Sequence, residues 1–104
     1  MTIQTAVRSL PVRLVSTLTG ADVRSVERWR TGTTPRRTAF VRRLDDLAAV
    51  LELLGPGMTD RGKGAWLTSR SAYLGMARPL DLLAAGEFDR VAGAARAYSS
   101  GDSV

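Results

Sequence analysis

The segment from Thr34 to Leu54 restricts the fold more than any other part of the chain. Thr34-Pro35 suits the start of a helix, because threonine is a good cap and proline is tolerated at the first helical position. Gly55-Pro56 breaks the pattern at the other end. Between them, large apolar residues recur at helical spacing at Phe40, Leu44, Leu47, Leu51 and Leu54. This pattern predicts one helix of roughly 30 Å that could serve as the spine of the whole chain.

The residues before this helix carry the signals of three shorter helices, and strand signals are weak. Ile3, Ala6, Val7 and Leu10 fall at helical spacing. A second helix is expected over 11–18, with proline in its first turn and Gly20 ending it in a left-handed conformation. Asp22 is a good N-cap for a third helix that runs to residue 31, where Gly32 stops it.

The residues after the long helix suggest a linker and a small helical module. Residues 55–64 hold four glycines and are expected to form a mobile linker. A short helix at Trp66-Leu67 and helices over 79–85 and 87–98 should follow, and the tail from residue 99 is polar. The apolar face of the last helix consists of Phe88, Val91, Ala95 and Tyr98. The predicted fold is all-α, with a helix-turn-helix bundle (1–54), a linker (55–64) and a helical module with a tail (65–104).

Composition excludes several classes of chemistry. The 104 residues include neither cysteine nor histidine, which removes disulfides, thiolate catalysis and the commonest general base and metal ligand. Asp45 and Asp46 are adjacent and so project about 100° apart on a helix, which does not suit a paired acid and base. We therefore expect a protein that is not an enzyme and needs no cofactor or metal. No apolar run exceeds five residues, so we expect no membrane contact and a cytoplasmic location.

Arginine is concentrated in the first half of the chain. Residues 1–54 hold nine arginines against five acids, and residues 24–43 hold seven arginines with Glu27 as the single acid. Such a cluster suits a polyanion, because neutralised phosphates release their counterions whatever the base sequence. The alternative is a coding bias, since the chain has fourteen arginines and one lysine.

The third helix divides into an apolar and a polar side. At about 100° per residue, Val23, Val26 and Trp29 share one arc and should pack inward. Arg24 and Arg28 lie on the other side, and Ser25 lies near the exposed N-terminal end. Two short helices joined by a glycine-containing turn form a helix-turn-helix, whose second helix reads base edges in the major groove.

Four arginines are the candidate DNA contacts. Arg24 and Arg28 are the candidate base readers, because arginine pairs with guanine through two hydrogen bonds. Arg36 and Arg37, at the start of the next helix, are better placed for phosphates. A solvated amphipathic face is the alternative explanation for Arg24 and Arg28.

The stretch from Arg78 to Val91 is expected to provide packing without catalytic chemistry. Pro79 and Asp81 favour helix initiation, and Gly86 allows a sharp reversal into the next helix. Leu80 and Leu83 should share one side and serve the core. We expect Arg78 to pair with Glu87 or Asp89. A module of about forty residues has little core of its own, so it should lean on the long helix or on a second subunit.

Two segments resemble the Xre/MbcA/ParS-like antitoxins. The stretch 14–54, above all "RSVERWRTG", resembles their Xre-type helix-turn-helix half. The stretch 65–98, "AWLTSRSAYLGMARPLDLLAAGEFDRVAGAARAY", resembles their toxin-binding domain, in which a Trp-Leu pair, a loop, an Arg-Pro-Leu-Asp-Leu-Leu element and a final helix follow one another. Together the two matches cover about four-fifths of the chain in the order typical of the family.

The resemblance implies the antitoxin of a RES-Xre toxin–antitoxin pair. Its partner would be a RES-domain toxin that consumes NAD⁺, whose active site the antitoxin occludes. The helix-turn-helix half is similar to domains that bind the promoter of their own operon, with Arg24, Ser25 and Arg28 as DNA readers. A homodimer and a hetero-oligomer with the toxin are implied as well. The residues that would shape or make the toxin contact are Arg78, Pro79, Leu80, Leu83, Gly86, Glu87, Val91, Tyr98, Ser99, Ser100, Gly101, Asp102, Ser103 and Val104.

The sequence departs from the family pattern in two places, and one other function stays open. The segment before the helix-turn-helix is short, which puts dimerisation through that region in doubt. The loop "SRSAYLGMARP" lacks the Asn-Pro pair common in relatives, so loop contacts do not transfer residue by residue. A plain helix-turn-helix transcriptional regulator without a toxin partner is the alternative function.

Overall fold

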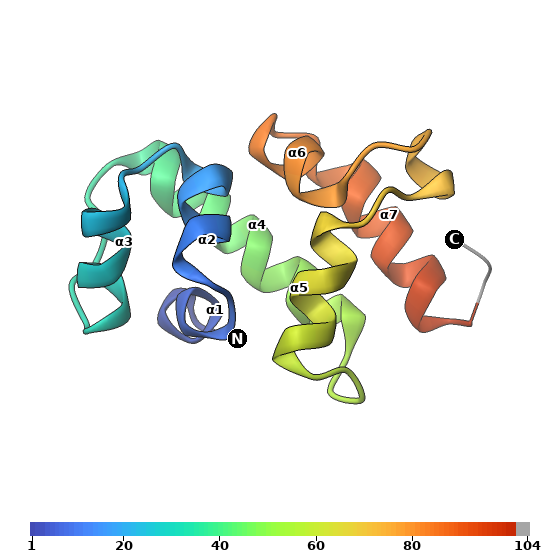
Figure 1. Cartoon of the computed structure of the whole chain (residues 1–104), viewed down its shortest axis with the longest axis horizontal. Helices are drawn as coiled ribbons and strands as arrows, with labels where there is room; N and C mark the ends of the chain where they lie inside the picture. Colours follow the sequence, from blue (N-terminus) through green and yellow to red (C-terminus); the bar gives the residue numbers. More distant parts are fainter. Residues whose placement is uncertain (102–104) are drawn as a thin grey trace.

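Helices make up all the regular secondary structure of the described residues, as the sequence predicts. The structure is a computed structural model that describes residues 1–101. In chain order (Figure 1), the elements are α1 (Ile3–Ser9), α2 (Val12–Thr19), α3 (Val23–Arg30), α4 (Thr38–Leu54), α5 (Asp60–Thr68), the short 3₁₀-helix η1 (Ala72–Leu74), α6 (Pro79–Ala84) and α7 (Phe88–Ser99). The all-α prediction is confirmed.

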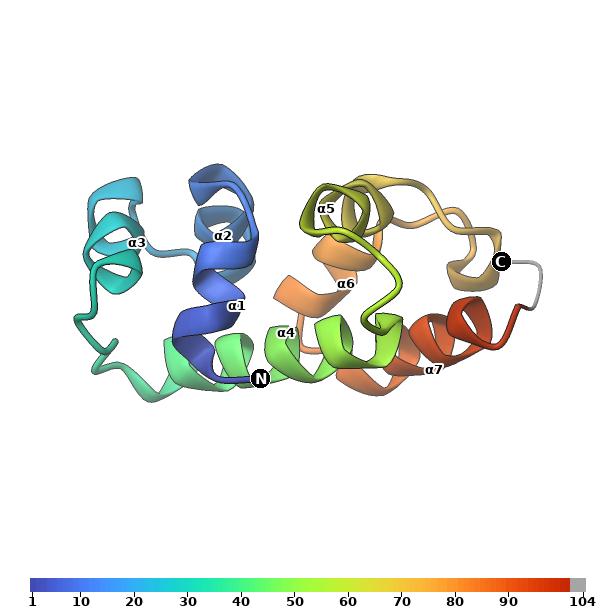
Figure 2. The ribbon, with the colours of Figure 1, turned by 90° about the horizontal axis from the view of Figure 1, so that it is seen from below.

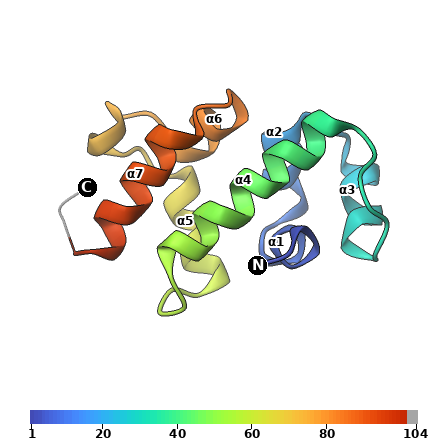
Figure 3. The same cartoon turned by 180° about the vertical axis from the view of Figure 1, so that it is seen from behind.

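Helix α4 is the spine of the molecule. In Figure 2 it runs along one side of the body, with α1, α2 and α3 over its first half and α5 and α6 over its second. Seen from behind (Figure 3), α7 lies beside the second half of α4, and these two helices pack closely. Helix α7 carries three small buried side chains, Ala92, Ala94 and Ala95, and small side chains permit close helix packing.

Helix α4 begins later than predicted, at Thr38 with Arg37 as its N-cap. The prediction of Thr34 as cap and Pro35 as first helical residue was wrong. Pro35 is buried in the loop between α3 and α4. The backbone N–H of Thr33 donates to the carbonyl oxygen of Arg28 at 3.1 Å, which folds this loop back onto α3. The residue before a proline is also pushed out of the helical region, so the chain becomes helical only after the loop.

The predicted signals around the second and third helices are confirmed. Gly20 ends α2 in the left-handed region, with φ +82°. The carboxylate of Asp22 caps α3 by accepting a hydrogen bond from the backbone N–H of Ser25 at 2.7 Å. Val23 departs from the prediction. It was expected to pack inward but is 44% exposed, because it is the first residue of α3 and no element covers it.

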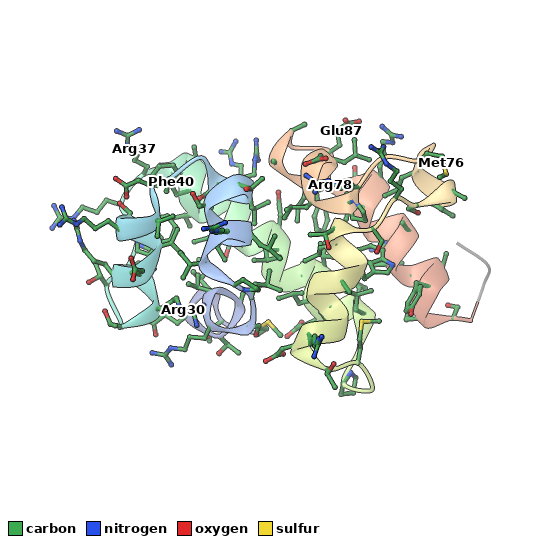
Figure 4. The ribbon with its side chains drawn as sticks, in the orientation of Figure 1. Arg30, Arg37, Phe40, Met76, Arg78 and Glu87 are labelled. Atoms are coloured by element: carbon green, nitrogen blue, oxygen red, sulfur yellow. The ribbon has the colours of Figure 1, made fainter. Side chains whose placement is uncertain are left out.

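Two arginines tie the ends of α1 and α3 together. Nη1 of Arg30 donates to the carbonyl oxygens of Val7 and Leu10, at 3.3 and 2.6 Å, at the end of α1. In return, Nε of Arg8 donates to the carbonyl oxygen of Arg30 at 3.0 Å. Carbonyl groups at a helix C-terminus lack partners within the helix, and cationic donors suit them. Arg30 (labelled in Figure 4) therefore belongs to the scaffold.

The segment 55–64, expected to be a mobile linker, is helical in its second half. Helix α5 begins at Asp60, and the hydroxyl of Thr59 caps it by accepting from the N–H of Gly62 at 3.0 Å. Gly64 is buried, and a Cβ built on it would lie 3.7 Å from Leu10. Gly64 therefore lies at the contact between α5 and the N-terminal helices and not in a linker.

One continuous core joins the two halves of the chain. It extends from Ala6 in α1 to Ala95 in α7, and α6 packs on α2 as well as on α7. The expectation that the C-terminal module leans on the long helix is confirmed. Tyr98 does not belong to this core, contrary to the prediction. It is 43% exposed, and its ring packs edge-on against Trp66 at a centroid distance of 6.2 Å.

Candidate functional sites

The first candidate site is the arginine-rich end formed by α3 and the loop to α4. Arg24, Arg28, Arg36 and Arg37 are all exposed there, and Ser25 is half-buried beside them. The structure thus brings the five predicted DNA contacts to one end of the molecule, the end that carries Arg37 and Phe40 in Figure 4.

A depression of about 390 Å³ opens between α3 and this loop. Three arginines line it, together with three hydroxyl side chains and a floor of two aromatic rings and a proline. The lining residues are Ser25, Arg28, Trp29, Thr33, Thr34, Pro35, Arg36, Arg37 and Phe40. No carboxylate is among them, so the depression is a positively charged pocket.

The floor of the depression is rigid. The Trp29 and Phe40 rings pack with their centroids 5.5 Å apart, and the Arg37 guanidinium lies 5.4 Å from the Phe40 centroid. Trp29 is only 5% exposed, so this stack connects a surface cation to the core. On the rim, the backbone N–H and the hydroxyl of Thr31 donate to the Arg28 carbonyl oxygen, at 3.1 and 2.9 Å.

A second depression, of about 360 Å³, shares Ser25, Arg37 and Phe40 with the first, and it has a different charge. It contains the carboxylate of Asp22 as well as Arg37. The hydrogen bond from the Ser25 backbone holds the pKa of Asp22 below its usual value, and nearby Arg28 and Arg24 lower it further. Asp22 is therefore ionised at neutral pH, and this second depression is lined by one cation, Arg37, and one anion, Asp22.

The second candidate site is the opposite end of the molecule, where α5, η1 and α7 meet. The edge-on rings of Trp66 and Tyr98 line a depression of about 390 Å³ there, together with Ser69, Arg70 and Ser71. Ser99, Ser100 and Gly101 continue α7 and are exposed. Asp102, Ser103 and Val104, predicted to take part in the toxin contact, lie outside the described residues.

The apolar residues of the predicted toxin-binding stretch are buried. Leu80 is 1% exposed, Leu83 and Val91 are fully buried, and Pro79 is buried as well. These side chains hold the shape of the module and are not available to a partner in this conformation. Leu80 and Leu83 share one side, as predicted.

The ion pairs of this stretch differ from the prediction. Arg78 pairs with Asp81 and not with Glu87 or Asp89, through two hydrogen bonds of 2.9 Å. The pair is three residues apart across the first turn, which is closer than either predicted partner. It lowers the pKa of Asp81 and raises that of Arg78. Glu87 pairs with Arg90 at 3.0 Å.

Gly86 makes the reversal between α6 and α7, with φ +86°. A Cβ at this position would lie 3.0 Å from Nη2 of Arg43. Nε of Arg43, a residue of α4, donates to the carbonyl oxygen of Ala84 at 3.2 Å. This contact fastens the end of α6 to the spine, and its strength depends on the absence of a side chain at Gly86.

Two exposed apolar residues at this end were missed by the sequence reasoning. Tyr73 is 54% exposed and Met76 is 55% exposed. Met76 has φ +70°, unusual for a residue other than glycine. The backbone N–H of Met76 donates to the Ser71 carbonyl oxygen at 2.7 Å, and Nη1 of Arg70 donates to the Met76 carbonyl oxygen at 3.2 Å. The largely apolar run "AYLGM", of which only Leu74 is buried, was the available signal.

Comparison with known proteins identifies the family. No family model matches the chain. A probable mycobacterial cidal antitoxin of Mycobacterium tuberculosis (strain ATCC 25618 / H37Rv) is 38% identical over 79 residues, which cover 75% of this chain and 66% of that protein's length. A chain in the crystal structure of the M. tuberculosis MbcT-MbcA toxin-antitoxin complex superposes with a TM-score of 0.80 at 28% identity, over 95% of this chain and 91% of that chain. The chain belongs to the MbcA-like antitoxins. The resemblance seen in the sequence is thereby confirmed.

In this MbcA-like chain the two candidate sites lie at opposite ends of the long axis (Figure 1). Among the described residues, no helix combines the length and apolar character needed to cross a membrane. Nor do residues 1–101 contain a group of three or more His, Cys, Asp or Glu side chains that could hold a metal ion. Both candidate sites are built from arginines, aromatic rings and hydroxyl groups, which are groups suited to binding.

Proposed function

We propose that this chain is an antitoxin that neutralises a protein toxin by binding it. The observation that carries the proposal is the superposition of 95% of the chain on a chain of the MbcT-MbcA toxin-antitoxin complex. The identity of 38% with a probable cidal antitoxin supports it independently. The lack of a catalytic constellation in the sequence agrees with a binding role.

The toxin contact is made by the end formed by α5, η1 and α7. Buried Leu80, Leu83 and Val91 hold the platform, while Tyr98, Ser99, Ser100 and Gly101 are exposed at its tip. The toxin belongs to the RES-domain class and degrades NAD⁺. The end of α7 and the tail that follows it occlude the toxin's active site, in the cytoplasm where this cofactor pool is found.

Co-expression with the protein encoded by the adjacent reading frame tests this function. We expect the partner alone to lower cellular NAD⁺ and arrest growth, and the pair to restore both. A chain that lacks residues 99–104 should fold, because Ser99, Ser100 and Gly101 are exposed, but should restore NAD⁺ poorly. Glu27→Ala, which changes an exposed side chain on α3 at the opposite end of the molecule, is the matched control. Absence of a complex between the two proteins, with no recovery of NAD⁺, would refute the proposal.

A second function, binding of operator DNA, is favoured by the arginine-rich end. Exposed Arg24 and Arg28 lie on a helix that Asp22 caps, the geometry of a recognition helix. The antitoxin would bind the promoter of its own operon as a homodimer, since palindromic half-sites require two such helices. We expect preference for the promoter duplex over a shuffled duplex, and loss of that preference on Arg24→Ala. Equal affinity of the intact chain for both duplexes would argue against operator recognition.

A further inference from the structure

The depression between α3 and the α3–α4 loop combines features that suit one phosphate group. Arg28, Arg36 and Arg37 line it without any carboxylate, and the hydroxyl residues Ser25 and Thr33 lie between them. Guanidinium and hydroxyl groups are the donors that hold DNA phosphates. Arg30, although close in sequence, is engaged with backbone carbonyls of α1 and does not belong to this set.

We infer that this depression is a clamp for one backbone phosphate of DNA, with Arg28, Arg36 and Arg37 as its cationic wall and Phe40 as the residue that positions Arg37. The inference rests on the DNA-binding function proposed above and deepens it. It also changes the role of Arg28. Because Arg28 lines the same pocket as the two loop arginines, it contacts the backbone, and Arg24 alone remains to read bases.

Charge decides which of the two depressions beside Arg37 the phosphate occupies. The second depression is lined by Asp22, whose carboxylate is ionised and repels a phosphate. A phosphate bound beside Arg28 and Arg36 meets three cations instead. The Asp22 carboxylate therefore repels the DNA backbone from its own depression and favours a phosphate position beside Arg28 and Arg36.

The aromatic stack fixes Arg37 before DNA arrives. Its guanidinium lies 5.4 Å from the Phe40 centroid, and Phe40 packs at 5.5 Å on Trp29, which is almost completely buried. A free arginine loses side-chain entropy on binding, and one already held on a ring loses less. Phe40 is thus a positioning residue, and it acts through Arg37.

The test is a salt titration of DNA binding by fluorescence anisotropy, with the promoter duplex and a shuffled duplex of equal length and composition. Each phosphate contact contributes about 0.9 to the slope of log K against log salt, so it accounts for roughly a threefold loss of affinity between 50 and 200 mM salt. We expect Arg28→Ala, Arg36→Ala and Arg37→Ala each to weaken both duplexes equally and to reduce the slope by about one. Arg61→Ala, at a distance from the clamp on α5, should leave both affinity and slope unchanged.

Phe40→Leu separates positioning from charge. It keeps an apolar side chain on Trp29 and leaves every arginine in place. We expect affinity for both duplexes to fall about two- to fivefold, the weight of an exposed cation–π contact, while the salt slope stays at the wild-type value. Adding Phe40→Leu to Arg37→Ala should cause no further loss. Circular dichroism of each variant verifies that the helices are intact.

Different results overturn different parts of the account. If Arg28→Ala, Arg36→Ala and Arg37→Ala bind DNA with the same salt slope as the intact chain, the clamp is refuted, while DNA binding itself is not. If Arg28→Ala lowers affinity for the promoter duplex but not for the shuffled duplex, Arg28 reads bases and does not contact a phosphate. Unchanged affinity with Phe40→Leu would remove the positioning role. An intact chain that binds neither duplex would refute the DNA-binding function, and the clamp with it.

Discussion

Leu83→Ala tests whether the two halves of the chain share one core. Leu83 lies in α6 and is fully buried, and its shortening removes three buried carbon atoms. At about 0.8 kcal/mol for each, the transfer term alone is about 2.4 kcal/mol. The cavity left behind raises the loss in unfolding free energy to about 3 kcal/mol. With a urea m-value of about 1.5 kcal/mol/M, the unfolding midpoint falls by about 2 M.

The chain's two tryptophans allow each half to be observed separately. Trp29 lies in α3 and Trp66 in α5, so Trp66→Phe and Trp29→Phe variants each leave one fluorescent reporter. Because the core is continuous, Leu83→Ala should shift the midpoint at Trp29 as far as the midpoint at Trp66. A shift confined to Trp66, with Trp29 unfolding at its original urea concentration, would show that the halves are separate units and refute the reasoning.

Three further predictions concern local features of the C-terminal half. Gly86→Ala should lower the unfolding free energy by about 1–2 kcal/mol, because φ is +86° there and the new Cβ would meet Arg43; urea unfolding equal to the intact chain would contradict it. Burial raises the pKa of Asp46 above its ordinary value, so ionising this carboxyl opposes folding. The intact chain should therefore gain stability relative to Asp46→Asn as pH is lowered through that raised pKa, and parallel pH curves would argue against this. Arg78 lowers the pKa of Asp81, so this pair stabilises the fold above the ordinary carboxyl pKa and is lost as pH falls through the lowered one. The intact chain should then be slightly more stable than Asp81→Asn at pH 7, and the two should be equally stable near pH 2. Thermal unfolding of both proteins at the two pH values measures this difference.

Local signals in the sequence were sufficient for most of the helices. Gly20 and Asp22 act through their own backbone and nearest neighbours, so their roles as helix stop and N-cap could be derived from position alone. The apolar stripe of α4 predicted the spine for the same reason. The late start of α4 could not be predicted, because it depends on the burial of Pro35 and on a loop that folds back onto α3.

Errors arose where a residue's role depends on distant parts of the chain. Gly64 resembles a linker glycine in sequence, but it is buried within α5 beside Leu10. Helical periodicity assigned Val23 and Tyr98 to the core, yet both lie at helix ends and are 44% and 43% exposed, Tyr98 with Trp66 packed against its ring. In the candidate DNA site, sequence spacing grouped Arg28 with Arg24, and its role as a base reader stays a prediction; the fold adds that Arg28 lines one depression with Arg36 and Arg37.

Hydrogen–deuterium exchange of the chain, alone and in complex with the RES-domain partner, tests the central claim most directly. The claim is that the end formed by α5, η1 and α7 binds the toxin while α3 and its loop stay free. We predict slower amide exchange on binding over residues 65–76 and 96–101, and unchanged exchange over residues 23–37. Protection confined to residues 23–37, with the C-terminal end exchanging as in the free chain, would contradict the account.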